Sequence, residues 1–217
     1  MNNKTACTLR GLYAITPDWA DTPRLLTVTE ALLQAGCRIV QYRNKTADAT
    51  LQRLQALALR QLTQHYYACL IINDDIELAL FSAADGVHLG EDDGQLQAAR
   101  AQLAAANGPC QIIGASCYQS LPLALAAARA GADYLAFGSF FASPTKPHAQ
   151  RADPHLIAAA QQQTGLPVCA IGGITPDNAA SLLTAGADML AVISAVYAVV
   201  DPYQAGLIFQ KMFKPSC

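Results

Sequence analysis

The chain has 217 residues, of which 53% are hydrophobic and 14% charged, with a formal net charge of −2 at pH 7. The length suits one large domain or two small ones, and the apolar composition favours a parallel sheet that is covered on both faces. A charge so close to zero gives no reason to expect nucleic acid or an anionic membrane as a partner. Any anion-binding site must therefore come from a local cluster of basic side chains.

The N-terminal stretch MNNKTACTLRG lacks the apolar core of a signal peptide, and no apolar run in the sequence approaches transmembrane length. The seven cysteines are an odd number without a CxxC pair, so we expect neither a zinc site nor a disulfide framework. Cys69 and Cys169 lie in apolar strand-like runs, where a thiol packs as a small hydrophobe. These features favour the cytoplasm as the compartment.

Short apolar runs alternate with helical stretches rich in Ala, Leu and Gln along the whole chain. Several of the helical stretches begin with proline, which suits the first turn of a helix. The predicted strands are 11–16, 38–43, 69–73, 86–89, 111–116, 134–138, 168–171 and 189–193. The predicted helices include 23–33, 47–66, 121–129, 154–163, 176–184 and 202–211.

An internal repeat supports this alternation. The segments AGADYLAFGS (130–139) and AGADMLAVIS (185–194) share one register, and each reads as a helix end, a tight turn and a strand. Eight such strands without a linker predict an α/β fold, a single-domain (β/α)₈ TIM barrel over residues 1–217, with short unstructured ends at about 1–9 and 214–217. An open doubly wound sheet is the alternative, although no GxGxxG motif opens the first helix.

Residues 38–45 read RIVQYRNK, a predicted strand that ends in polar side chains. Gln41, Arg43 and Lys45 alternate, so they leave the backbone on one face. In a barrel, the repeat aligns this face with small residues at the ends of the sixth and eighth strands, which predicts a pocket at the mouth. The alternative is that both cations curl out to solvent. His88 shares the inward register, where a packed core histidine is favoured over a catalytic one.

Acidic side chains end the next two predicted strands, in LIINDD (70–75) and in VHLGEDD (87–93). Asp75 precedes the helical run IELALF and is expected to cap it. Asp74 and one acid of the second cluster can converge on a hard cation from adjacent strands. Oxygen ligands alone favour Mg²⁺ over zinc. Each cluster taken alone is equally well explained as a helix cap or a solvated loop.

The sixth predicted strand runs into GSFFASPTKPH (138–148), a loop with two hydroxyls and an amine at Ser143, Thr145 and Lys146. A plain turn with a solvated lysine is the alternative for this loop. The seventh strand ends in paired glycines, and the eighth in Ser194. The loops after these two strands form the usual phosphate site of such barrels. The mouth is thus predicted to hold two anion sites, one for a monophosphate and one for a Mg²⁺-bound diphosphate.

These motifs, in this order, resemble those of the thiamine phosphate synthase family, barrel enzymes that couple a hydroxymethylpyrimidine diphosphate to a thiazole phosphate. QYRNK resembles the family's Q-[YF]-R-x-K, INDD its ND motif, DGVHLGEDD its DGVHLGQ-[ED]-D, and ASPTK its P-T-x-T-K. The resemblance implies that Gln41, Arg43, Lys45, Asn73, Ser116 and Lys146 bind the pyrimidine diphosphate, with Arg43, Lys45, Ser116 and Lys146 catalytic; that Ser143, Thr145, Gly173, Ile193 and Ser194 bind the thiazole phosphate; and that Asp74 and Asp93 bind Mg²⁺.

Two departures from the family pattern stand out. Glu91 replaces a common Gln and adds a negative charge beside the expected metal ligand. Ala142 and Ser143 replace the usual Pro and Thr, which keeps a hydroxyl and gives a less rigid loop.

The resemblance implies a transferase that releases diphosphate from the pyrimidine by a dissociative substitution, without a protein nucleophile. Small-molecule substrates are the expected partners, and a homodimer is left open. Two alternatives remain: a related thiazole tautomerase, which does not need the diphosphate and magnesium residues, and a non-catalytic sensor of a phosphorylated ligand.

Overall fold

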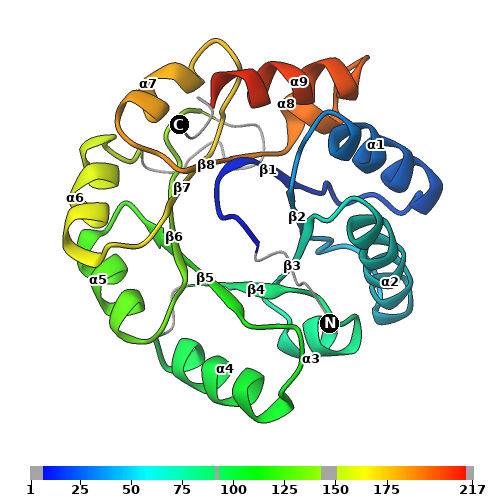
Figure 1. Ribbon diagram of the computed structural model, residues 1–217, viewed down its shortest axis with the longest axis horizontal. Helices are drawn as coiled ribbons and strands as arrows, with labels where there is room; N and C mark the ends of the chain where they lie inside the picture. The colour runs from blue at the N-terminus through cyan, green and yellow to red at the C-terminus, as the bar shows by residue number, and fades with distance from the viewer. Residues whose placement is uncertain (1–6, 91–92, 143–150, 214–217) are drawn as a thin grey trace.

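The computed structural model describes residues 7–90, 93–142 and 151–213, without the side chains of residues 93–95. Its strands pair in parallel and in chain order, and β8 pairs with β1 to close a barrel. Figure 1 shows this ring of strands with the helices outside it. The expected TIM barrel is confirmed, and closure excludes the open sheet. The strands are β1 (Gly11–Ile15), β2 (Ile39–Tyr42), β3 (Cys69–Asn73), β4 (Gly86–Leu89), β5 (Ile112–Tyr118), β6 (Tyr134–Phe137), β7 (Val168–Ile171) and β8 (Met189–Val192).

Most helices begin where the sequence places a capping side chain. Asp75 caps α3 as expected, because its Oδ1 accepts the backbone N–H of Leu78 at 2.8 Å. One helix starts later than the predicted residue 176. In that loop, Asn178 accepts the N–H of Thr175 and donates to the Gly173 carbonyl, which delays the helix. The helices are α1 (Thr22–Gln34), α2 (Ala49–His65), α3 (Ile76–Phe81), α4 (Asp93–Ala106), α5 (Leu121–Arg129), α6 (His155–Thr164), α7 (Ala179–Thr184), α8 (Ser194–Tyr197) and α9 (Pro202–Met212).

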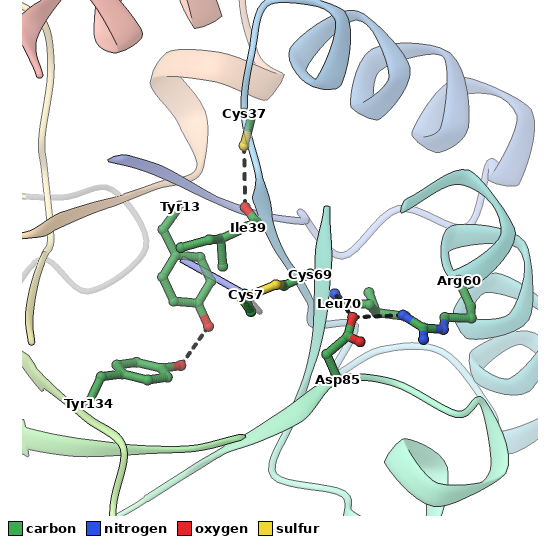
Figure 2. The surroundings of a disulfide bond; sticks show 9 residues. All are labelled: Cys7, Tyr13, Cys37, Ile39, Arg60, Cys69, Leu70, Asp85 and Tyr134. Atoms are coloured by element: carbon green, nitrogen blue, oxygen red, sulfur yellow. Dashed lines mark hydrogen bonds and ion pairs between the residues drawn. A yellow bond between two sulfur atoms is a disulfide. The ribbon is translucent and has the colours of Figure 1, made fainter. Parts of the chain in front are cut away.

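The internal repeat has a structural cause at the N-terminal end of the barrel. Asp133 and Asp188 of the two repeat segments precede β6 and β8, Asp85 precedes β4 in the same way, and each carboxylate bridges a strand and a helix. It accepts a backbone N–H at the start of a neighbouring strand and an N–H from a helical side chain (Figure 2 shows Asp85). The donors are Leu70 N and Arg60 Nη1 for Asp85, at 2.9 and 2.6 Å; Ile113 N and Arg100 Nη2 for Asp133, at 2.7 and 2.6 Å; and Val168 N and Gln161 Nε2 for Asp188, at 2.9 and 2.7 Å.

The core has two layers, one between strands and helices and one inside the barrel. Two tyrosines, Tyr13 and Tyr134, are the largest fully buried side chains of the inner layer. Tyr134 fits because the facing position on β5 is Gly114, where a Cβ would overlap the phenol ring. The tyrosines thus fill the floor below the mouth, and the cavity described below begins above them.

The structure contains a disulfide bond that the sequence analysis did not predict. Cys7 and Cys69 form a disulfide with their Cα atoms 5.9 Å apart (Figure 2), so Cys69 is not a free thiol. Cys7 lies in a stretch without helix or strand, so no periodicity could place it beside the first residue of β3. Cys169 does behave as expected: it is a buried free thiol inside the barrel, and burial raises its pKa. Among the described helices, none is both long and apolar enough to cross a membrane.

Candidate active site

A cavity of about 680 Å³ opens at the mouth, where the C-terminal ends of the strands meet. Predicted residues from several strands line it together. Those whose side chains or backbone are described are Gln41, Arg43, Lys45, Asn73, Asp74, Ser116, Gly173, Ile193 and Ser194. Four predicted positions, the side chain of Asp93 and all of Ser143, Thr145 and Lys146, lie outside the described residues, as does Glu91.

One wall of the cavity carries the two cations that follow β2. Arg43 Nη1 contacts both carboxylate oxygens of Asp18, at 3.0 and 3.1 Å, and the backbone N–H of Lys45 donates to the same carboxylate at 2.8 Å. The hydroxyl of Thr16 accepts the N–H of Arg43 and donates to its carbonyl. Residues after β1 therefore hold the end of β2 in place. The sequence prediction missed Asp18. The signal that could have identified it is its position, an acidic residue just after the neighbouring predicted strand in LYAITPD.

Asn44 fixes the turn between these cations and α2. It is buried, its amide donates to the carbonyl of Trp19 at 3.0 Å and to Gln55 Oε1 at 3.1 Å, and its Oδ1 accepts the N–H of Ala47. Because Asn44 points into the protein, its neighbours Arg43 and Lys45 point to the mouth. The sequence prediction also missed Asn44, because its partners Trp19 and Gln55 are distant in the sequence.

The acidic side of the mouth is Asp74, at the end of β3. Its φ of +62° is unusual for a residue with a Cβ, and such conformations gather at functional sites. Oδ2 accepts a hydrogen bond from Asn73 Nδ2 at 2.7 Å and lies 3.4 Å from Lys45 Nζ. The side chain is 52% exposed, and among the described residues Oδ1 accepts no hydrogen bond. Asp74 therefore presents one carboxylate oxygen that suits a hard cation.

The opposite side of the mouth is a backbone surface. Gly172 and Gly173 have φ values of +103° and +62°, a region that glycine adopts without strain. A Cβ on Gly173 would lie 2.9 Å from the Phe141 backbone carbon, so a side chain does not fit. Ile193 and Ser194 line the same part of the cavity, at the end of β8. This neutral surface of bare amides suits a monophosphate.

The sequence of the chain matches a family of enzymes. A family model described as thiamine monophosphate synthase matches residues 12–196. The chain belongs to the thiamine monophosphate synthase family. It is 53% identical over 205 residues to the thiamine-phosphate synthase of Methylobacillus flagellatus, covering 94% of this chain and 96% of the relative. It is 51% identical over 203 residues to that of Thiobacillus denitrificans, covering 94% of each.

A solved structure agrees with this family. The thiamine phosphate pyrophosphorylase from Pyrococcus furiosus superposes with a TM-score of 0.82 at 34% identity, covering 94% of this chain and 95% of that one. A 3-hexulose-6-phosphate synthase superposes with a TM-score of 0.71 at 16% identity, covering 94% of this chain and 100% of that one, which shows a shared fold alone. The motif-based assignment to thiamine monophosphate synthases is confirmed, and with it the class, a transferase of thiamine biosynthesis that releases diphosphate.

His88 is a hydrogen-bonded core residue of the barrel, as the sequence favoured. Its side chain is 8% exposed and both ring nitrogens have partners, Tyr134 OH and Ser116 Oγ, each at 2.9 Å. Burial lowers the pKa of His88 to about 4, against the opposing effect of the Asp74 carboxylate. The imidazole is therefore neutral at pH 7, and its geometry is that of a positioned hydrogen-bonding group.

Proposed function

We propose that the protein condenses 4-amino-2-methyl-5-(diphosphooxymethyl)pyrimidine with 4-methyl-5-(2-phosphooxyethyl)thiazole, giving thiamine phosphate and diphosphate. The observation that carries this proposal is a single cavity with a cationic wall, Arg43 and Lys45, on one side and the bare amides of Gly173 on the other. Two walls of different chemistry suit two phosphorylated substrates. The names of the relatives support the same reaction.

The pyrimidine diphosphate is assigned to the wall built by β2, β3 and β5. Arg43 and Lys45 bind diphosphate oxygens, and Asp18 holds the Arg43 guanidinium in position for them. Asn73 and Ser116 contribute neutral hydrogen-bonding groups from the neighbouring strands. Gln41 lies deeper, 3% exposed, and contacts the pyrimidine ring. The thiazole phosphate is assigned to Gly173, Ile193 and Ser194.

Mg²⁺ fits the acidic side of the mouth. The carboxylate of Asp74 is exposed beside the cationic wall, and Asp93 begins the helix after the adjacent strand. Oxygen donors with room for water and substrate phosphate are the set that Mg²⁺ prefers. When bound, Mg²⁺ supplies charge neutralisation for the departing diphosphate. Asp74 and Asp93 would hold it, and Lys146 is proposed to contact the same diphosphate.

The protein acts by binding, orientation and exclusion of water. Arg43, Lys45 and the Ser116 hydroxyl stabilise the negative charge that grows on the diphosphate as the carbon–oxygen bond breaks. The thiazole nitrogen then forms the new bond at the methylene carbon, because both substrates share one cavity. Apolar side chains such as Ile15 and Ile171 line that cavity and limit the access of water. This dissociative route needs no protein nucleophile.

The experiment is a product assay with purified protein, both substrates and Mg²⁺. We expect thiamine phosphate and diphosphate in equal amounts, and loss of turnover when a chelator removes the metal. Conversion of a thiazole tautomer without diphosphate release would favour the tautomerase. Tight binding of thiazole phosphate with no product at saturating substrates would favour the sensor. Either result would contradict the synthase.

The compartment and the assembly stay predictions from the sequence. A cytoplasmic location was favoured partly because no disulfide was expected, and the Cys7–Cys69 bond weakens that argument. A homodimer also stays a prediction.

A further inference from the structure

A continuous chain of hydrogen bonds crosses the interior of the barrel below the cavity. It joins five side chains from five strands, and its ends are two residues assigned to the pyrimidine diphosphate site. Figure 2 shows the second of its four links, where the Tyr13 and Tyr134 hydroxyls point toward each other. In order, the links are Gln41 Nε2 to Tyr13 OH at 2.8 Å, Tyr13 OH to Tyr134 OH at 2.7 Å, Tyr134 OH to His88 Nδ1 at 2.9 Å, and His88 Nε2 to Ser116 Oγ at 2.9 Å.

The direction of every link follows from the first. Gln41 Nε2 is a donor, so the Tyr13 oxygen accepts there. The buried Tyr13 proton also needs an acceptor, and the Tyr134 oxygen, 2.7 Å away, provides it. The single proton of Tyr134 then goes to His88 Nδ1. A neutral imidazole that accepts at Nδ1 carries its proton on Nε2, so His88 donates to Ser116 Oγ.

Burial keeps both phenols protonated, as this order of hydrogen bonds requires. Tyr13, Tyr134 and His88 are buried, with at most 8% of any of the three exposed. Burial raises the pKa of both tyrosines, so both phenols keep their protons at pH 7. Each ring is also fixed by packing: His88 stacks on Tyr134 with centroids 5.6 Å apart, and Tyr13 meets Tyr134 edge-on at 5.9 Å.

We propose that Tyr13, Tyr134 and His88 are positioning residues that make the Ser116 hydroxyl a dedicated hydrogen-bond donor toward the anionic diphosphate. Because Ser116 Oγ already accepts from His88, its single proton is left for the cavity, which Ser116 lines. An oriented O–H donor stabilises an anionic oxygen without the cost of reorientation as charge develops. The role of Ser116 rests on the proposed function, whereas the direction of the chain does not.

The kinetic test removes one link at a time. Tyr134→Phe keeps the ring and deletes the hydroxyl, so His88 loses the donor that fixes its tautomer. We expect kcat to fall about tenfold, the effect of one misdirected hydrogen bond to a charged group. His88→Gln, whose amide can occupy the Nε2 position and donate, should keep more activity than His88→Asn, which is too short to reach Ser116.

A double-mutant cycle separates this role from a general structural one. If Tyr134 acts through Ser116, then Tyr134→Phe should reduce kcat little further once Ser116 is alanine. Equal fold-losses in the presence and absence of the Ser116 hydroxyl would overturn the proposal. An equal loss for His88→Gln and His88→Asn, with both folded, would also count against it.

A spectroscopic test does not need turnover. In protein labelled with ¹⁵N-histidine, the protonated and unprotonated ring nitrogens give well-separated resonances, and we expect His88 as the Nε2–H tautomer. The Nδ1–H tautomer would reverse the hydrogen bonds of His88 to Tyr134 and Ser116 and overturn the proposal. Because this spectrum does not depend on activity, a failed product assay with the Nε2–H tautomer would refute the synthase function alone.

Discussion

Replacing Arg43 with alanine is expected to lower kcat/KM for thiamine phosphate formation by about 100- to 1,000-fold, the usual loss when one stabilising group at a developing charge is removed. The guanidinium lines the cavity and is held by both oxygens of Asp18, so its loss removes an oriented contact to the leaving diphosphate. Asp74→Ala should lower kcat/KM by a similar factor, because it removes a proposed ligand of Mg²⁺. Steady-state kinetics with each substrate varied in turn measures both effects.

The same variants should leave the thiazole phosphate site almost unchanged. We expect its dissociation constant, measured by calorimetry, to change by less than about twofold, as for independent sites. Arg129→Ala is the matched control, because it removes the same charge from an exposed position at the end of α5. A loss of thiazole phosphate affinity as large as the loss of turnover would show that the two substrates do not use separate walls.

The second large effect is expected at Gly173, on the opposite wall. Gly173→Ala should weaken thiazole phosphate binding by at least about tenfold, which corresponds to roughly 1.4 kcal/mol. An alanine at a φ of +62° is strained, and its Cβ would lie 2.9 Å from the Phe141 backbone carbon, so the amides must move. The affinity for pyrimidine diphosphate should stay unchanged, and calorimetry with each substrate alone measures both constants.

Gly165→Ala is the control for this variant. Gly165 also has a positive φ, +69°, but nothing lies within 4 Å of the added Cβ, and it ends α6 at the other end of the barrel. This variant should lose stability similarly and keep both affinities. Unchanged thiazole phosphate binding in a folded Gly173→Ala protein would remove the glycine surface from the acceptor site.

The sequence predicted the fold well because barrel strands and helices carry local signals. Period-two and helical patterns identified the strands and helices, and the AGAD repeat marked a real contact, the carboxylate bridges of Asp133 and Asp188. The helix after β7 was predicted too early because its start depends on the side chain of Asn178, which ties the loop to Gly173. A single side-chain contact of this kind produces no periodic pattern in the sequence.

The sequence predicted those parts of the site that carry a local signal, and it missed those that depend on contacts between distant residues. The alternation of Gln41, Arg43 and Lys45 showed which face of β2 meets the cavity. By contrast, Asp18 supports Arg43 from another strand end, and only strand pairing brings the two together. Tyr13 and Tyr134 look like ordinary core residues, because their hydroxyls meet only after the barrel closes.

The most direct test of the two-wall site is a crystal structure of the protein with Mg²⁺, thiamine phosphate and diphosphate. We expect the diphosphate against Arg43, Lys45 and Ser116, with the metal on Asp74, and the monophosphate against the amides of Gly173 and Ser194. A monophosphate on the Arg43 wall, or a diphosphate outside the cavity, would contradict the assignment of the two substrates to opposite walls of one mouth.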